Sequence, residues 1–262
     1  ISCKGITLQE RPGNPPPRIA ETPSGMLNSV GLQNPGVDHF IEKDLPWLRE
    51  QGVTIIANIA GNTPEDYCAM AEKLNDTDID MIEMNISCPN VKQGGVQFGT
   101  SCAGVEDITK AVRAHCKKPL MVKLSPNVTD ISEIALAAES AGADAVSMIN
   151  TLTGMRIDIN TKRPIIHNNT GGFSGPALLP IAVRMVWQTY QKVKIPIVGL
   201  GGISTWQDAV EMLLAGATAL QIGTVLFTDP YAPVKIIDGL TNYMDKNGVK
   251  TLSELTGAMR PW

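Results

Sequence analysis

The chain has 262 residues, a formal net charge of −4 and a sequence pI near 5.4, so it lacks the basic balance of a nucleic-acid-binding protein. No apolar run reaches the roughly 18 residues that a membrane-spanning helix needs, which argues against a membrane partner. Five cysteines at irregular spacing and three scattered histidines match neither a disulfide framework nor a metal-ligand pattern, and we expect a cytoplasmic protein with no metal site in this chain.

The first part of the chain is irregular. Residues 1–4 are typical of a short strand that ends in a lysine, and three successive prolines at 15–17 forbid a helix in the segment that follows. A structureless connection as long as 13–36 usually builds or covers a site. Within it, the stretch 28–34 combines amide side chains with Gly31, a residue that lets the backbone approach a ligand closely.

From residue 37 onward, helical patterns alternate with apolar strands. Thr63 as N-cap, Pro64 at the first helical position and acids in the first turn predict one helix start. Apolar strands between amphipathic helices indicate a parallel sheet covered on both faces. Further helices are predicted over 37–51 and near 105–116, 131–141, 176–192 and 205–215, an extended insert at 151–174, and strands at 1–4, 53–58, 81–86, 119–124, 145–150, 196–201 and 219–223.

The strand count predicts the architecture. Seven strands are one fewer than the eight of a (β/α)8 TIM barrel. Because the chain begins at Ile1 and not at methionine, we expect the first strand and its loop to lie upstream, with residues 1–262 forming a single barrel domain. An open doubly wound sheet is the alternative, and the lack of a Gly-x-Gly-x-x-Gly turn after an early strand argues against it.

Polar residues collect where the predicted strands end, and in a barrel these ends form the active-site face. Two lysines, several amides and one thiol would converge there. A lysine in an apolar strand, such as Lys123, costs free energy unless its ammonium finds a partner; the alternative is a side chain that snorkels to the surface. The strand ends carry Lys4, Asn58, Asn85, Cys88, Asn90, Lys123, Asn150, Thr151, Gly201, Gly202, Gly223 and Thr224.

The turn over residues 85–90 places a thiol between two carboxamides at a strand end. Pro89 prevents strand or helix from continuing. A lone cysteine is usually a small buried hydrophobe, but Cys88 has short polar neighbours on both sides. The glycine-rich segment 91–100 that follows is typical of a lid over a substrate, or of an ordinary surface loop.

Glycine turns follow the last two predicted strands. Gly201-Gly202 and Gly223-Thr224 offer bare backbone N–H groups, and barrels often build a phosphate site at these places. One Gly-Gly pair is weak evidence for a phosphate site, whereas two such turns on the last two strands are stronger evidence for it. Gly175, in the glycine-rich stretch that opens the preceding helix near 176–192, would supply a third backbone contact. The sequence therefore predicts a phosphate site.

These motifs together resemble the catalytic subunit family of dihydroorotate dehydrogenase, over essentially the whole chain. The resemblance implies an FMN-containing barrel that oxidises dihydroorotate to orotate in pyrimidine biosynthesis. Cysteine in the motif is typical of the cytosolic class 1, and the continuation 91–100 is similar to the NAD-linked class 1B. The matching stretches are 4–5 with 13–18, 28–36, 85–90, 122–127, 149–151, 172–176 and 199–203.

The resemblance also implies roles for individual residues. Cys88 would be the base that removes a proton from C5 of dihydroorotate while hydride leaves C6 for flavin N5, with Lys4 and Lys123 lowering the thiol pKa and stabilising negative charge on the flavin. The substrate-binding residues would be Lys4, Asn28, Ser29, Val30, Gly31, Leu32, Asn85, Asn90, Asn150 and Thr151. The FMN-binding residues would be Lys4, Gly5, Asn58, Asn85, Lys123, Ile149, Gly175, Gly201, Gly202, Gly223 and Thr224.

The resemblance to class 1B implies a partner subunit, and other functions remain as alternatives. Its catalytic subunit forms a homodimer core of a heterotetramer, and the partner electron-transfer subunit carries FAD and a [2Fe–2S] cluster. The fumarate-linked class 1A ranks second. The same barrel could instead oxidise another reduced pyrimidine such as dihydrouracil, or act without flavin as a scaffolding protein. We expect structural roles for Cys3, Cys68, Cys102 and Cys116.

Overall fold

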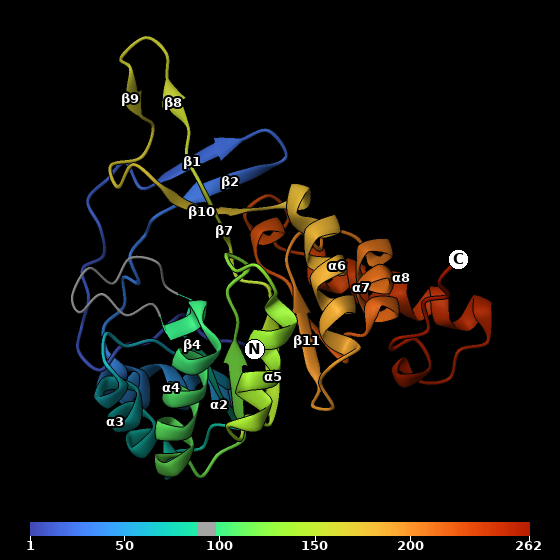
Figure 1. Cartoon of the computed structure of the whole chain (residues 1–262), viewed down its shortest axis with the longest axis horizontal. Helices are drawn as coiled ribbons and strands as arrows, with labels where there is room; N and C mark the ends of the chain where they lie inside the picture. Colours follow the sequence, from blue (N-terminus) through green and yellow to red (C-terminus); the bar gives the residue numbers. More distant parts are fainter. Residues whose placement is uncertain (88–97) are drawn as a thin grey trace.

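The fold is built on a parallel sheet of six strands, in the order β12-β11-β6-β5-β4-β3. The computed structural model describes residues 1–87 and 98–262 (Figure 1). Each strand was predicted from its apolar run, and the observed bounds differ by a few residues. They are β3 Ile56–Ile59, β4 Met81–Asn85, β5 Leu120–Lys123, β6 Ala145–Met148, β11 Ile197–Leu200 and β12 Ala219–Gln221.

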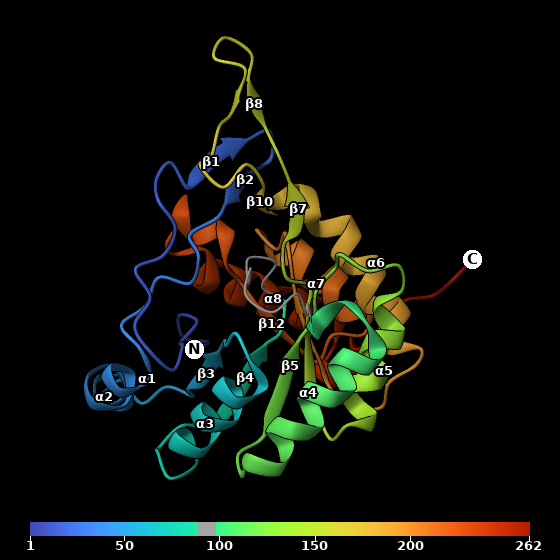
Figure 2. The same ribbon diagram turned by 60° about the vertical axis from the view of Figure 1, so that its left-hand side comes forward.

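Helices connect the parallel strands and cover the outside of the sheet, each packing against the next in the chain (Figure 2). The predicted start at Thr63 is confirmed, because its side chain accepts a hydrogen bond from the Asp66 amide and the Asp66 carboxylate accepts one from the Thr63 amide. Thr205 and Asp208 form the same capping box. The helices are α3 Pro64–Asn75, α4 Cys102–His115, α5 Ile131–Ser140, α6 Leu179–Tyr190, α7 Trp206–Ala215 and α8 Ala232–Asn247, with short helices η2 Phe98–Thr100, η3 Pro176–Leu178, η4 Thr224–Phe227 and η5 Leu252–Glu254.

The sheet is strongly curled. Gln221 on β12 donates a hydrogen bond of 2.9 Å to Glu83 on β4, although these strands are four places apart in the sheet order. In a flat sheet the two strands would lie about 19 Å apart. The contact therefore crosses the concave face, and this face is the interior of a barrel wall, as the sequence predicts.

Two helix and strand predictions need correction. The helix predicted over 37–51 is divided into α1 Val37–His39, a π-helical segment η1 Phe40–Asp44 and α2 Leu45–Glu50. Pro46 lacks an N–H group, so a regular hydrogen-bond ladder cannot run through this segment. The strand predicted over 1–4 is replaced by two isolated parallel bridges, from Ser2 to Ile56 and from Ile6 to Ile59.

The break between these bridges has a geometric cause. The amide of Cys3 donates to the carbonyl of Ile56, and the next bond runs from the amide of Ile6 to the carbonyl of Asn58. Between these two hydrogen bonds the N-terminal segment advances by three residues while β3 advances by two, as at a β-bulge. Lys4 and Gly5 occupy the extra position, which brings this pair beside β3 without regular strand pairing.

A second sheet lies beyond the carboxyl ends of the parallel strands (Figures 1 and 2). It has the order β1-β2-β10-β7 and is antiparallel. The prediction that 13–36 is structureless is therefore wrong for part of its length, whereas the extended character of 151–174 is confirmed. The strands are β1 Ile19–Thr22, β2 Gly25–Asn28, β7 Leu152–Gly154 and β10 Gly171–Ser174, and a two-stranded hairpin, β8 Ile157–Asp158 and β9 Arg163–Pro164, projects from it.

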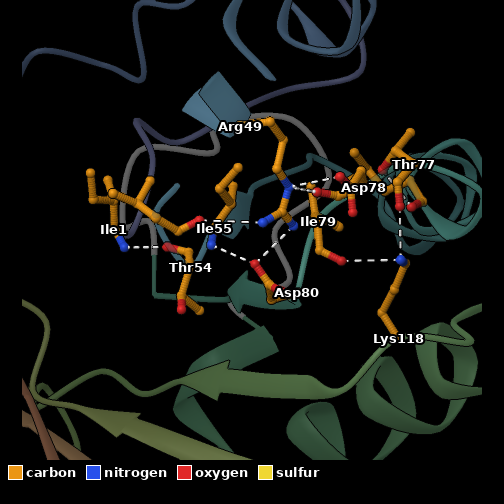
Figure 3. A network of polar contacts seen from close by, with 11 residues as sticks. Ile1, Arg49, Thr54, Ile55, Thr77, Asp78, Ile79, Asp80 and Lys118 are labelled. Atoms are coloured by element: carbon orange, nitrogen blue, oxygen red, sulfur yellow. Dashed lines mark hydrogen bonds and ion pairs between the residues drawn. The ribbon is translucent and has the colours of Figure 1, made fainter. Parts of the chain in front are cut away.

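The opposite end of the parallel sheet is held by a polar network (Figure 3). Asp80 accepts hydrogen bonds from the Ile55 amide and from Arg49, which ties the start of β3 to the start of β4. The Lys118 ammonium donates to the carbonyls of Thr77 and Ile79. These contacts fix the amino ends of the strands and leave the carboxyl ends to carry the site. None of the helices in 1–87 and 98–262 has the length and hydrophobicity to cross a membrane.

Candidate active site

Three predicted site residues meet where neighbouring parallel strands end. Asn85 and Lys123 are register partners on β4 and β5. The amide of Asn150, just beyond β6, donates to the Asn85 side-chain oxygen at 3.3 Å. The Ser87 hydroxyl donates to the Lys123 carbonyl at 2.8 Å, and Tyr67 donates to the Asn85 carbonyl at 2.8 Å. The strand ends are therefore tied to one another by side chains as well as by the sheet ladder.

A buried carboxylate lies one residue pair further into the barrel. Glu83 has no exposed surface, and it is the only acidic or basic side chain that is buried in the described part of the chain. One oxygen, Oε1, accepts from Ser147 at 2.7 Å and from Gln221 at 2.9 Å. The other, Oε2, accepts from Asn58 and from Ser2, the latter at 3.1 Å. Strands β3, β6 and β12 thus converge on one side chain of β4.

The surroundings of Glu83 favour its charged form. Burial opposes that form and by itself raises the pKa of the carboxyl group. The Lys123 ammonium, together with the hydrogen bonds from Ser147, Asn58 and Gln221, acts in the opposite direction, and the pKa of Glu83 lies below its ordinary value. Glu83 is therefore a carboxylate over the physiological pH range.

Lys123 is an ammonium with unused donors. Its Nζ lies 3.8 Å from Glu83 Oε2, close enough for an ion pair but beyond hydrogen-bond distance, and its side chain is 17% exposed. Within residues 1–87 and 98–262, the Nζ of Lys123 pairs with Glu83. An ammonium carries three N–H donors, and a mostly buried one requires acceptors. Lys123 therefore has N–H donors available at the strand ends.

The loop after β2 is held in shape by Asn34. This buried side chain accepts from the amides of Thr7 and Gly36, at 3.1 and 2.9 Å, and donates to the Thr7 hydroxyl at 2.8 Å and the Leu32 carbonyl at 2.7 Å. Leu32 has φ of 57°, in the left-handed region that side chains rarely adopt. Asn34 therefore fixes the backbone of the predicted substrate loop.

The remaining predicted substrate residues of this loop are spread along it. Asn28 is the last residue of β2 and pairs with Gly172 of β10. Ser29 is 2% exposed, and its hydroxyl has no hydrogen-bond partner among the described residues. Val30 and Gly31 follow, and the Val30 carbonyl accepts from the Asn14 amide at 2.9 Å. A buried hydroxyl without a partner is uncommon and is consistent with a site that takes a polar ligand.

Lys4 and Gly5 lie beside the strand ends. A Cβ atom at Gly5 would be 3.2 Å from Asn58 Oδ1 and 3.1 Å from Leu32 Cδ2, so Gly5 joins β3 to the substrate loop. Asn58 itself is 5% exposed and points to Glu83. Lys4 is exposed.

The predicted glycine turns differ in what they contact. Gly201 packs on Ile149, whose Cγ1 would be 3.2 Å from a Cβ at that glycine. Gly202 has φ of 82°, and a Cβ there would lie 2.4 Å from the Leu179 amide nitrogen. A Cβ at Gly175 would lie 2.5 Å from the Gly25 Cα, in the antiparallel sheet. Gly202 and Gly175 need glycine to let the backbone segments approach, and Gly201 needs it for its φ of 120°.

Among the four glycines predicted to bind phosphate, Gly223 faces open space. It is exposed, and a Cβ built on it would have no atom within 4 Å, while Thr224 begins η4 directly after it. Thr151 lies against β10, because its Oγ1 would be 2.2 Å from a Cβ at Gly172. The predicted base Cys88 and substrate residue Asn90 lie outside the described residues.

Sequence reasoning missed the residues that hold the site together. Ser147 and Gln221 both donate to Glu83 inside the barrel, and Asn34 fixes the loop. A signal for Glu83 was present, because an acid inside the apolar run 81–84 must have buried partners. Gln221 and Ser147 gave no such signal, since a single polar residue near a strand end is common.

The comparisons with known proteins agree with this arrangement. The family model described as dihydroorotate dehydrogenase matches residues 1–244. Three similar relatives are each named dihydroorotate dehydrogenase B (NAD(+)), catalytic subunit. They come from Bacteroides thetaiotaomicron (57% identical over 260 residues, 99% of this chain and 86% of the relative), Alkaliphilus metalliredigens (56% over 259 residues, 99% and 86%) and Geotalea uraniireducens (53% over 260 residues, 99% and 85%). The chain therefore belongs to the dihydroorotate dehydrogenase family, a family of oxidoreductases with the TIM-barrel fold.

Proposed function

We propose that this protein oxidises (S)-dihydroorotate to orotate in pyrimidine biosynthesis, as the catalytic subunit of an NAD-linked enzyme. The observation that carries the proposal is Lys123, which lies next to Asn85 and Asn150 at the strand ends. It is a mostly buried ammonium whose N–H donors meet no acceptor within hydrogen-bond distance among the described residues. The names of the relatives support the same activity and the same electron acceptor.

The residues present fit FMN, the cofactor that members of this family generally use. Lys123 has donors for a polar ring edge, and the space beside Gly223 admits a group that a side chain would fill. In the proposal, the flavin ring is held by Lys4, Gly5, Asn58, Asn85, Lys123 and Ile149, and the phosphate by Gly175, Gly201, Gly202, Gly223 and Thr224. When bound, FMN supplies the acceptor for the hydride that leaves C6 of the substrate.

The substrate would be held by amides. Dihydroorotate has a carboxylate and an imide edge, and carboxamides present donors as well as acceptors to such groups. Asn85 and Asn150 already contact one another at the strand ends, and the unpartnered Ser29 hydroxyl offers a further polar contact. The proposed set is Lys4, Asn28, Ser29, Val30, Gly31, Leu32, Asn85, Asn90, Asn150 and Thr151.

Cys88 is proposed as the base that takes the proton from C5. A thiol does this as the thiolate, and nearby positive charge lowers the pKa of a thiol. Lys123 provides such a positive charge at the end of β5. The carboxylate of Glu83, which lies deeper in the barrel, partly offsets this charge. Removal of the C5 proton and loss of hydride from C6 together form the double bond of orotate.

Electron transfer to NAD⁺ requires a second protein in this proposal. The words "catalytic subunit" in the names of the relatives support a separate partner, for which we propose a subunit with FAD and a [2Fe–2S] cluster in a heterotetramer with a homodimer core. A cytoplasmic location is part of the same proposal. It is supported by the cysteines Cys3, Cys68, Cys102 and Cys116, all of which are free thiols.

Anaerobic titration tests the activity. The purified protein, loaded with FMN, should lose its flavin absorbance on addition of dihydroorotate and keep it on addition of dihydrouracil. Re-oxidation by NAD⁺ should require the partner subunit. Bleaching by dihydrouracil alone would identify another pyrimidine as the substrate, and rapid re-oxidation by fumarate without a partner would indicate the fumarate-linked class instead. A protein that binds no FMN would contradict the proposed function.

A further inference from the structure

Glu83 has all of its hydrogen-bonding capacity occupied. A carboxylate has about four lone-pair sites. Four donors fill them, two on each oxygen: Ser147 and Gln221 on Oε1, Asn58 and Ser2 on Oε2. With no exposed surface and no vacant acceptor position, Glu83 is poorly placed to exchange protons with a substrate. Its charge is instead fixed in place by β3, β4, β6 and β12.

This saturation explains the spacing of the ion pair. Because Glu83 needs no hydrogen bond from Lys123, the ammonium can remain 3.8 Å away and keep its three N–H donors for another acceptor. The negative charge of the carboxylate still offsets the positive charge of the ammonium at this distance. Glu83 also fixes Asn58, a second residue assigned to the cofactor, by accepting from its amide.

We propose that Glu83 is a positioning residue of the flavin site, a fixed buried charge that orients Asn58, balances Lys123 and thereby sets the reduction potential of the bound FMN. This inference rests on the proposed function, because it takes FMN as the group that Lys123 and Asn58 contact. Glu83 acts only through these two side chains and takes no proton in the reaction.

The alternative role is purely structural, in which Glu83 only closes the barrel interior. A glutamine at this position distinguishes the two roles, because it keeps the shape and removes the charge. Its partners tolerate the exchange: the Ser147 hydroxyl can accept as well as donate, and the Gln221 amide can turn to present its oxygen. A structural role would alter the stability of Glu83→Gln without a directed change in the flavin potential.

The test measures the two-electron reduction potential of bound FMN by equilibration with a reference dye. In Glu83→Gln the positive charge of Lys123 is no longer offset, so reduced FMN should bind about tenfold more tightly relative to oxidised FMN. This ratio corresponds to a positive shift of about 30 mV. The matched control is Glu133→Gln, which removes the same charge from an exposed pair with Lys192 and should leave the potential unchanged.

A second variant gives the opposite sign. Gln221→Met removes one donor from Glu83 and leaves its charge less neutralised, so the potential should move in the negative direction by a smaller amount. If Glu83→Gln does not fold, the potential of Gln221→Met alone tests the role of Glu83. An unchanged potential in both variants, while wild-type protein binds FMN, would overturn the role of Glu83 and leave the proposed function intact. Wild-type protein that binds no FMN would overturn both.

Discussion

The Glu83 carboxylate and the Lys123 ammonium lie 3.8 Å apart inside the barrel, and Glu83 is fully buried while Lys123 is 17% exposed. They come from adjacent strands, β4 and β5, and from successive levels of the sheet, since Lys123 is the register partner of Asn85 and not of Glu83. At the level of Glu83, inside the barrel, the neighbouring side chains donate to its carboxylate. At the level of Lys123 and Asn85, the carboxyl ends of the strands carry the amides. The pair thus links the packed interior to the face that we assign to the chemistry.

Lys123→Met should be strongly destabilising. Removal of one member of a buried ion pair leaves an uncompensated charge and costs about 3–5 kcal/mol. The second substitution Glu83→Gln should restore part of this loss, because no unpaired charge remains. The measurement is denaturant unfolding of the flavin-free protein. Lys192→Met is the control, since its exposed pair with Glu133 contributes about 1 kcal/mol or less. Strict additivity of the two single changes would contradict the pairing.

Acid should remove the contribution of Glu83 to stability. The pKa of Glu83 is lower in the folded protein than its ordinary value of 4.5, so its charge stabilises the fold fully above 4.5 and this contribution is lost as the pH falls through the folded pKa. Asp80 acts in the same direction, because the Ile55 amide holds its pKa below the ordinary range. The difference in unfolding free energy between wild type and Glu83→Gln isolates Glu83. It should be constant near neutral pH and shrink below 4.5; a difference that grows on acidification would have the wrong sign.

Asn34→Ala should loosen the loop over 28–34. The change removes four hydrogen bonds and leaves buried partners at Thr7 and Gly36, at a cost of about 1–3 kcal/mol. Because Leu32 depends on Asn34 for its left-handed backbone, we expect the KM for dihydroorotate to rise more than kcat falls. Steady-state kinetics measure both. Asn247→Ala, at an exposed position on α8, is the control and should change neither. A lowered kcat with an unchanged KM would assign Asn34 no part in binding.

Two glycines should respond differently to alanine. Gly202→Ala places a Cβ 2.4 Å from backbone at a φ of 82°, and we expect the flavin-free protein to be destabilised. Gly223→Ala meets no atom and has a negative φ of −128°, so it should fold normally but bind FMN more weakly, since the added methyl group occupies the proposed phosphate space. Unfolding curves and FMN titrations separate the two effects. Normal FMN affinity in Gly223→Ala would remove this glycine from the phosphate site.

The sequence was most informative where local chemistry determines the structure. The helix start at Thr63 was predicted, and Thr63 and Asp66 form a capping box there, because both partners are close in the chain. The six parallel strands follow from apolar runs that must be buried on both faces. The predicted continuous helix over 37–51 was wrong, because the prediction rested on apolar spacing and ignored Pro46. This proline lies at the start of α2, directly after the π-helical segment that ends at Asp44.

Contacts between distant segments could not be predicted in this way. β1 and β2 are short, and they are stabilised partly by β10, which lies far along the chain. Gln221 gave no sign of a partner on β4, because that contact depends on how strongly the sheet curls. The convergence of Asn85, Lys123 and Asn150 was predicted, since parallel strands bring their carboxyl ends to one edge.

The central claim is that Cys88 removes the C5 proton while dihydroorotate reduces the bound flavin. Stopped-flow measurement of flavin bleaching under anaerobic conditions tests this most directly, with wild type, Cys88→Ser and Cys102→Ser compared at saturating dihydroorotate. Cys102 is an exposed free thiol at the start of α4 and serves as the matched control. We predict bleaching in wild type, the same rate in Cys102→Ser, and a rate lower by about a hundredfold or more in Cys88→Ser, which retains its FMN. No bleaching in wild type, or an unchanged rate in Cys88→Ser, would contradict the account.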